Sequence, residues 1–223
     1  PIILLVLFKI KYLDYKYFFY LGFLFGLGYF LSSLYWIIYS LNFDPSLFIL
    51  KPLSVIIIPS ILSIFYGVSF FCVKKFISPN ILFFLSFSII LSFFEFLRGY
   101  LFTGFPWNLF VFTWSWSIES IQILSLIGTY SFNFISIIIF SSFFLILIKT
   151  SLKRIMICIT VVSFILLANF YFGKYLLIKN KLITASKIQI VLLQPDHNLG
   201  NFWKKNNEKN YIKKLIKLSN PKI

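Results

Sequence analysis

Two residues of opposite charge, Glu95 and Arg98, interrupt an otherwise apolar stretch of the sequence. Their spacing places both side chains on one face of a helix. A charge within a membrane-spanning helix costs roughly 2.5–3.5 kcal/mol on insertion scales, so such residues tend to be paired and functional. Two interpretations follow. The residues form a mutual ion pair that locks a helix end, or they form a polar site that opens on the outer leaflet of a membrane.

The segment that follows this pair interrupts the helical pattern. Gly99, Gly104 and Pro106 act as helix breakers, and the aromatic residues around them suit the boundary between lipid headgroups and water. These aromatic residues are Phe105, Trp107, Trp114 and Trp116. The composition therefore predicts an interfacial loop, whose aromatic side chains either anchor the protein or take part in a site.

The overall composition identifies the environment of this site. Hydrophobic residues make up 60% of the 223 residues and charged residues 12%, with a mean hydropathy of +0.92. A soluble domain has about 25% charged and 45–50% apolar residues. A water-soluble enzyme, a disordered tail and a disulfide-rich secreted module are therefore excluded, and a polytopic membrane protein is expected. The net charge of +15 does not indicate a nucleic-acid partner, because lysines at helix ends have a simpler membrane explanation.

Five segments are long and apolar enough to span a bilayer, which takes about 20 residues of helix. They cover about 17–40, 53–73, 80–98, 120–148 and 155–173. Backbone polar groups in lipid must pair within a segment, so helices are expected. The apolar residues 1–8 reach only about 12 Å as a helix, so we expect the stump of a truncated helix. Gly22 and Gly26 either allow close helix packing or have no packing role.

Loop charges predict the orientation of the bundle. The basic segments 9–16, 74–79 and 149–154 are expected in the cytoplasm. The alternate loops 41–52 and 99–119 carry only Lys51, with Arg98 at the adjoining helix end, and are expected outside together with everything after residue 173. The basic tail argues weakly for the opposite side, but long translocated domains largely escape the rule.

Residues 174–223 differ in character from the membrane part. A buried strand is expected over 188–194, a loop around 195–200 and an amphipathic helix over 203–218. Strand, loop and helix in this order are typical of the beginning of an α/β domain. The predicted fold class is therefore an all-α polytopic membrane helix bundle (1–173), followed by the truncated start of an α/β domain (174–223).

Other residues whose side chains could take part in chemistry give weaker signals. Cys72 and Cys158 both lie in apolar stretches and are expected to be buried small hydrophobes rather than a disulfide or a nucleophile. His197 lies alone in a polar segment, and nothing with metal-ligand spacing accompanies it. No metal and no cofactor is expected.

Two short motifs resemble a known family. Residues 95–99 (EFLRG) and 103–107 (TGFPW) together resemble the signature of bacterial apolipoprotein N-acyltransferases. The glycine-rich stretch 22–36 and residues 128–134 (GTYSFNF) are similar to other helices of that family. Residues 188–194 with Trp203 resemble the first strand and loop of its nitrilase-like domain. The resemblance runs over nearly the whole chain.

The resemblance implies a specific reaction. Family members transfer an acyl chain from a membrane phospholipid to the N-terminal diacylglyceryl-cysteine of an apolipoprotein, through a thioester on a Cys assisted by Glu and Lys. The partners implied are thus a phospholipid acyl donor, an apolipoprotein acceptor and membrane lipid, with no nucleic acid. The implied location is the bacterial inner membrane, with the nitrilase-like domain on the periplasmic side.

The catalytic residues of the family have no match in this sequence, so we assign none and expect the chain to be inactive alone, as a fragment or the product of an interrupted gene. Membrane-side residues are predicted to bind substrate or to shape its entrance. They are Glu95, Arg98, Gly104, Phe105, Pro106 and Trp107. A non-catalytic membrane scaffold and a small transporter subunit are the alternative functions.

Overall fold

The computed structural model describes residues 1–43, 45–77, 81–101, 104–148, 151–180, 192–193 and 208–219. The chain divides into two compact units, and each is considered by itself. The first unit comprises Pro1–Tyr35 and Ile56–Lys181, and the second comprises Trp36–Val55 and Leu182–Ile223.

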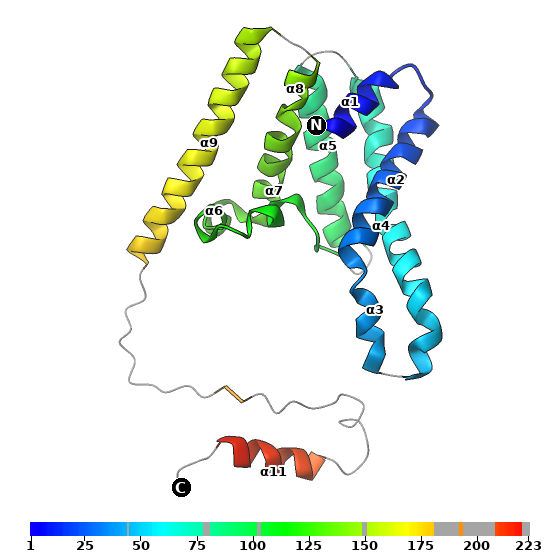
Figure 1. Ribbon diagram of the computed structural model, residues 1–223, viewed down its shortest axis with the longest axis vertical. Coiled ribbons are helices and arrows are strands. Elements are labelled where there is room, and N and C mark those ends of the chain that lie inside the picture. Colours follow the sequence, from blue (N-terminus) through cyan, green and yellow to red (C-terminus); the bar gives the residue numbers. More distant parts are fainter. Residues whose placement is uncertain are drawn as a thin grey trace. The chain divides into compact units, whose positions relative to one another are not determined.

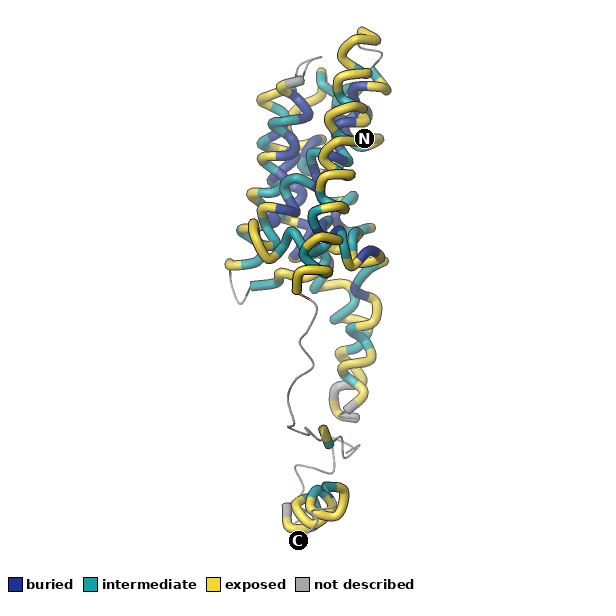
Figure 2. Tube along the Cα trace, turned by 90° about the vertical axis from the view of Figure 1, so that its left-hand side faces the viewer, coloured by how far each residue is buried: buried dark blue, intermediate teal, exposed yellow. Residues whose placement is uncertain are grey.

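Helices make up the first unit (Figure 1). In chain order they are α1 (Ile2–Lys9), α2 (Tyr15–Leu34), α4 (Lys51–Val73, from Ile56 on), η3 (Lys74–Phe76), α5 (Ile81–Tyr100), η4 (Phe110–Trp114), α6 (Ile118–Ile121), α7 (Leu124–Ser142), α8 (Phe144–Leu147) and α9 (Leu152–Lys179). Within this unit most helices are buried along one side and exposed along the other (Figure 2).

Five helices in the described part of the chain are long and apolar enough to cross a membrane, as many candidate spans as the sequence predicts. Their ends differ from the predicted ends. The first, α2, ends at Leu34 rather than near residue 40, whereas α9 continues to Lys179. At about 1.5 Å per residue, the 28 residues of α9 extend about 42 Å and exceed the ~30 Å hydrocarbon core. Hydropathy identifies the apolar part of a helix. It does not predict how far the same helix continues into the headgroup region.

Gly22 and Gly26 allow α2 to pack closely against α4, as one of the two interpretations predicts. A Cβ atom added at Gly22 would lie 2.5 Å from the carbonyl oxygen of Tyr66, and one added at Gly26 would lie 3.0 Å from the Tyr66 Cβ. Small residues at such positions let backbones approach each other in a membrane, where the gain comes from van der Waals packing. Gly28, on the same helix, has nothing within 4 Å of an added Cβ.

These distances give a test of the α2–α4 contact. Gly22→Ala is expected to lower the free energy of unfolding by about 1–3 kcal/mol, the usual cost of overpacking. Gly28→Ala is the matched control and should be neutral or slightly stabilising, because alanine favours helix over glycine by about 1 kcal/mol. Thermal denaturation in detergent, followed by the amount of monodisperse protein, measures both variants. Equal stability of the two variants would contradict the close packing.

One spanning helix, α9, contacts the rest of the unit mainly near one end. There the Asn169 side chain donates a hydrogen bond to the carbonyl oxygen of Ser120 in α6 (2.9 Å). Gly173 lies so close to α6 that an added Cβ would clash with the Glu119 carbonyl oxygen. None of the residues in the most apolar stretch of α9 is buried.

The second unit contains short elements around the beginning of α4 and a separate helix near the C-terminus. The elements are α3 (Ile37–Ser40), η1 (Leu41–Phe43), η2 (Pro45–Leu50) and α11 (Glu208–Ser219). In its described part the helix predicted over 203–218 is present as α11, whose lysines alternate with apolar residues at helical spacing. The predicted strand 188–194 and His197 fall on residues outside the described part, apart from Leu192 and Leu193, which belong to no regular element.

Candidate functional site

Glu95 and Arg98 lie on one buried face of α5, as their spacing predicts. Each is 1% exposed, although α5 is one of the spanning helices. The two side chains do not form a salt bridge with each other, unlike Lys16 and Asp14 near the start of α2. The two charged residues therefore have separate partners, and the interpretation as a mutual ion pair is not supported.

Glu95 connects α5 to two other spanning helices. The Tyr66 hydroxyl of α4 donates a hydrogen bond to its Oε1 atom (2.7 Å), and the Asn133 amide of α7 donates one to its Oε2 atom. The other atom of the Asn133 amide, Oδ1, accepts a hydrogen bond from the backbone N–H of Val111 in η4 (2.9 Å). Both carboxyl oxygens are thereby paired, which a buried polar group requires.

Arg98 holds the segment that follows α5, residues 104–109, here named the aromatic loop. Its Nη1 atom donates to the carbonyl oxygens of Phe105 and Trp107, both at 2.8 Å, and the Phe105 N–H donates back to the Arg98 carbonyl oxygen (2.9 Å). The guanidinium carbon lies 5.1 Å from the centre of the Phe30 ring, a favourable position for a cation. Nε and Nη2 are buried and have no hydrogen-bond partner among the described residues.

Two backbone positions with positive φ shape the aromatic loop. Gly104 has φ +75°, and an added Cβ would also clash with the carbonyl oxygen of Gly99; a left-handed conformation of this kind favours glycine. Asn108 has φ +58°, and its carbonyl oxygen accepts a hydrogen bond from the Tyr29 hydroxyl of α2 (2.9 Å). The loop is thus tied to α2 as well as to α5.

Gly99 has a role that differs from the predicted one. It was expected to break the helix, but α5 continues through it to Tyr100. Any Cβ at position 99 would clash with the Tyr130 hydroxyl of α7, so the glycine provides space for a neighbouring helix. The break comes after Tyr100, where Gly104 and Pro106 lie outside any helix.

The side chains of the aromatic loop differ in exposure. Phe105 is partly buried, whereas Pro106 is exposed and Trp107 is 50% exposed. The rings of Phe105 and Trp107 lie 5.5 Å apart. Farther along, the Trp114 indole N–H donates to the Ser136 hydroxyl (2.8 Å). Hydrogen bonds to the backbone of the aromatic loop therefore hold it in place, while its proline and tryptophan side chains remain exposed.

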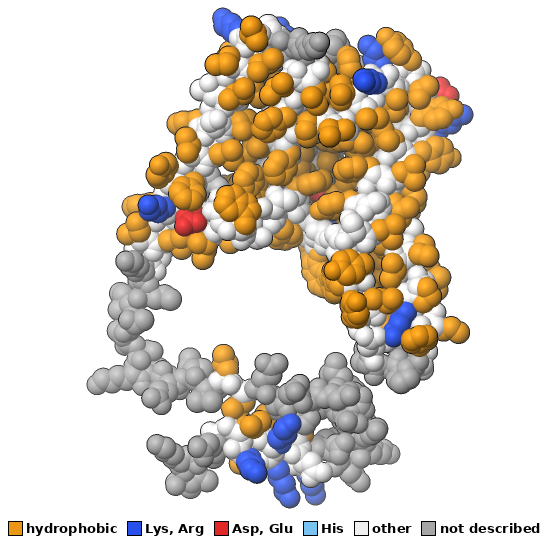
Figure 3. Space-filling model, viewed as in Figure 1, with side chains coloured by type: hydrophobic (Ala, Val, Ile, Leu, Met, Phe, Trp, Pro, Cys, Tyr) orange, Lys and Arg blue, Asp and Glu red, His pale blue; other side chains and the backbone are white. Residues whose placement is uncertain are grey.

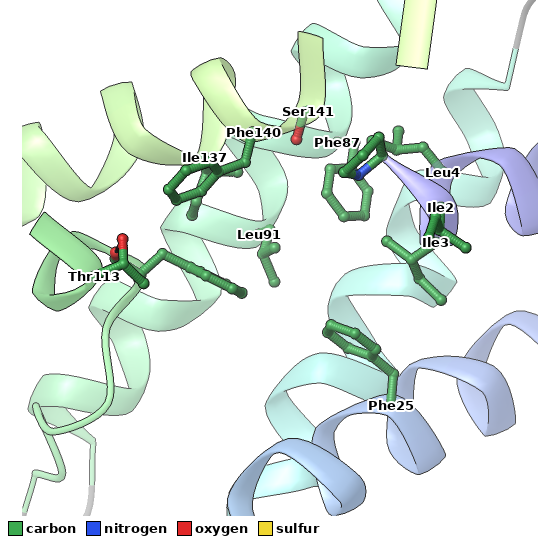
Figure 4. A pocket seen from close by; sticks show the side chains of 12 residues that line it. Ile2, Ile3, Leu4, Phe25, Phe87, Leu91, Thr113, Ile137, Phe140 and Ser141 are labelled. Atoms are coloured by element: carbon green, nitrogen blue, oxygen red, sulfur yellow. Dashed lines mark hydrogen bonds between the residues drawn. The ribbon is translucent and has the colours of Figure 1, made fainter. Parts of the chain in front are cut away.

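An apolar cavity lies next to η4, the element that directly follows the aromatic loop. Its volume is about 410 Å³, and its lining comes from α1, α2, α5, η4 and α7. Figure 4 shows Phe87 and Leu91 of α5, Ile137 and Phe140 of α7 and Phe25 of α2 around it. Thr113 and Ser141 supply the hydroxyl groups of the lining. Because η4 directly follows the aromatic loop, the position of the loop also sets one wall of the cavity.

The structure brings the six predicted site residues together as one assembly, in which Glu95 and Arg98 are internal and the loop is external. Sequence reasoning missed the partners Tyr66, Asn133 and Tyr29. Asn133, an amide within an apolar helix, carried a signal, since polar residues in spanning helices usually have a bonding role.

Among the described residues, no group of three or more His, Cys, Asp or Glu side chains is placed to bind a metal. Cys72 and Cys158 are free thiols, but both are partly exposed rather than buried as predicted.

The fold and this assembly define a multi-pass helical membrane protein with an ordered aromatic loop on a buried polar network. The hydrophobic side chains that cover its helices are visible in Figure 3. Residues 1–142 match the family model described as the apolipoprotein N-acyltransferase N-terminal domain, so the chain belongs to this family.

Curated relatives agree with this assignment. The chain is 35% identical over 122 residues to the apolipoprotein N-acyltransferase of Rhodopseudomonas palustris, with 54% of this chain and 23% of the relative covered. It is 38% identical over 126 residues to that of Rickettsia bellii, with 56% and 25% covered, and 35% identical over 127 residues to that of Rickettsia prowazekii, with 54% and 24% covered. The matched region thus spans about a quarter of each relative. No solved structure matches the chain.

Proposed function

We propose that this chain is the membrane part of an enzyme that transfers an acyl chain from a phospholipid to the N-terminal diacylglyceryl-cysteine of apolipoproteins. The observation that carries the proposal is the family match over residues 1–142. Relatives that share this region are named apolipoprotein N-acyltransferase. The membrane part would hold the lipid while the reaction takes place at the headgroup level.

The apolar cavity supports a role in holding an acyl chain. Its volume of about 410 Å³ is within the roughly 300–1,000 Å³ of typical ligand sites, and its lining is almost entirely hydrocarbon. In this proposal the acyl chain of the donor occupies the cavity, and the exposed Pro106 and Trp107 contact the lipid or the acceptor at its entrance. Glu95 and Arg98 are buried and act as positioning residues through the loop, while Gly104 provides its turn.

The chemical step is assigned to the nitrilase-like domain, as the resemblance implies. A Cys thiolate attacks the ester carbonyl of the donor, forms a thioester and releases the lysophospholipid; the acceptor amine then attacks the thioester and releases the thiol. An oxyanion forms in both steps and needs hydrogen-bond donors. No residue of this sequence is assigned to these roles, no cofactor is proposed, and we propose that the chain alone is inactive.

The proposal includes a location and a division of the chain. Residues 1–173 are the helix bundle of the inner membrane, and residues 174–223 form the linker and the beginning of the nitrilase-like domain. The basic segments 9–16, 74–79 and 149–154 face the cytoplasm, since positive charge favours that side. The aromatic loop and residues 174–223 then share the periplasmic side.

A chimera tests the proposed function. The matched 126 residues of the Rickettsia bellii relative are replaced by the corresponding region of this chain, and transfer of an alkyne-labelled acyl chain from phosphatidylethanolamine to a diacylated lipopeptide is measured in membranes. The chimera should be active, and this chain alone should not be. Leu91→Trp, which fills the cavity from α5, should reduce the activity of the chimera at least tenfold.

The matched control is Leu82→Trp, on the same helix but 61% exposed, which should retain activity. Folded yield is measured for every protein, and Leu91→Phe serves as a milder variant of the buried Leu91. A well-folded chimera without activity would contradict the assignment to acyl transfer. Activity of this chain alone would contradict the assignment of the chemical step to the nitrilase-like domain.

A further inference from the structure

A second apolar space, distinct from the cavity next to η4, lies between α9 and the α7–α8 segment. It is a groove of about 690 Å³. The α9 side of the groove includes Ile157, Val161 and Ile165, and the opposite side includes Ile138 and Ser142. Because α9 is unburied along its apolar stretch, this side of the helix needs an apolar partner of some kind.

The groove extends along α9 over about the thickness of one leaflet. Arg154 and Ile165 both line it, and at about 1.5 Å per residue they are separated by ~16 Å along α9, or about half of the ~30 Å hydrocarbon core. Farther along, Asn169 and Gly173 bring α9 against α6. A membrane-spanning helix would need a groove through the full thickness of the core, so the depth fits the chains of a lipid.

The charge at one end of the groove fits a phosphate group. Arg154 is the charged residue of the lining, and it forms no salt bridge with any acid in the described part of the chain. A guanidinium group presents its N–H donors in a fork that suits phosphate oxygens. A smaller groove of about 280 Å³ shares Ser142, Cys158 and Val162 with the first, which provides room for a second hydrocarbon chain.

We propose that a glycerophospholipid binds in this groove with its phosphate on Arg154 and its acyl chains between α9 and α7–α8. The aromatic loop precedes α7 and the groove lies toward its end. In the proposed orientation Arg154 lies at the cytoplasmic end of α9, so the bound lipid belongs to the leaflet opposite the loop. It is separate from the acyl donor because the linings of the groove and of the cavity share no residue. It covers the apolar stretch of α9, which the described part of the chain leaves unburied.

The two cysteines of the chain provide a reporter and a matched control. Cys158 lines the groove, whereas Cys72 lies on α4. The delipidated chain in detergent micelles is reacted with N-ethylmaleimide, and the rate at each cysteine is followed by peptide mass spectrometry. Dioleoyl phosphatidylglycerol should slow the reaction of Cys158 at least tenfold and leave that of Cys72 unchanged. Dioleoylglycerol, which lacks the phosphate, should protect only weakly.

Two substitutions test whether the charge of Arg154 itself, rather than nearby positive charge, binds the lipid. Arg154→Gln should raise the phosphatidylglycerol concentration needed for half-protection about tenfold, because a charge-assisted hydrogen bond is lost. Lys153→Gln, which removes the neighbouring charge outside the lining, should leave it unchanged. The Cys72 rate without lipid reports whether each variant is folded, and the comparison of the two lipids on the unaltered chain needs no variant.

Three outcomes would overturn the proposal. Equal protection of both cysteines would indicate general coverage by lipid. Equal protection by both lipids would remove the role of the phosphate. Protection without added lipid that disappears on dilution of the protein would assign the groove to a second copy of the chain.

Discussion

Glu95→Leu is expected to lower the free energy of unfolding by about 3 kcal/mol. The substitution leaves the Tyr66 hydroxyl and the Asn133 amide without their acceptor in a buried site, and each unmade hydrogen bond costs about 1–3 kcal/mol. The sum is reduced because an unfolded chain within a membrane also finds partners for polar groups. Unfolding by dodecyl sulfate, followed by tryptophan fluorescence, measures the change.

Graded variants test whether the hydrogen bonds cause this loss. Glu95→Gln retains an acceptor for Asn133 and should cost less than half as much as Glu95→Leu. Tyr66→Phe should cost about 1 kcal/mol, the net value of one hydrogen bond, and much of this cost should disappear when it is combined with Glu95→Leu. Full additivity of the two substitutions would show that Tyr66 and Glu95 do not act together.

Arg98→Met is expected to release the aromatic loop without a comparable loss of stability. Two hydrogen bonds from the guanidinium group hold the carbonyl oxygens of Phe105 and Trp107, and hydrogen bonds to charged groups contribute about 1.5–3 kcal/mol each. Their loss should increase the population of the open loop at least tenfold. The substitution also removes a buried cation, two nitrogens of which have no hydrogen-bond partner in the described part of the chain. The free energy of unfolding should therefore change by less than ~1 kcal/mol.

Thiol labelling separates these two effects. Phe105→Cys is introduced into a chain in which Cys72 and Cys158 are replaced by serine, and its reaction with a membrane-impermeant maleimide is timed with Arg98 and with Arg98→Met. The reaction should be at least ten times faster in the variant. Arg98→Lys keeps the charge but lacks the planar fork, so it should give an intermediate rate. Equal rates in all three proteins would mean that the loop is ordered by other contacts.

The sequence was sufficient to predict the helical membrane fold because a run of about 20 apolar residues is itself the physical requirement for crossing a bilayer. It also placed Glu95 and Arg98 on one face of a helix, since that depends only on helical spacing. The spacing of the small residues Gly22 and Gly26 offered a close contact as one of two interpretations, for the same local reason.

The partners of the two charged residues could not be predicted in the same way. Tyr66 lies 29 residues from Glu95 in a segment where one more aromatic residue carries no signal, and Asn133 lies 38 residues away. The acceptors for Arg98 are backbone carbonyl groups, which every residue possesses. A mutual ion pair was therefore as reasonable as the observed arrangement until the tertiary contacts were known.

The contact between Gly99 and Tyr130 also restricts how such sequences can diverge. A methyl group at position 99 and a hydroxyl group on the ring at position 130 would occupy the same space. A homologue with alanine at the first position should therefore have phenylalanine or a smaller residue at the second. Phenylalanine at position 130 is compatible with Gly99, whereas alanine at position 99 requires that exchange or a shift of the Tyr130 ring. The two sites are therefore expected to covary during evolution, with the change at position 130 first.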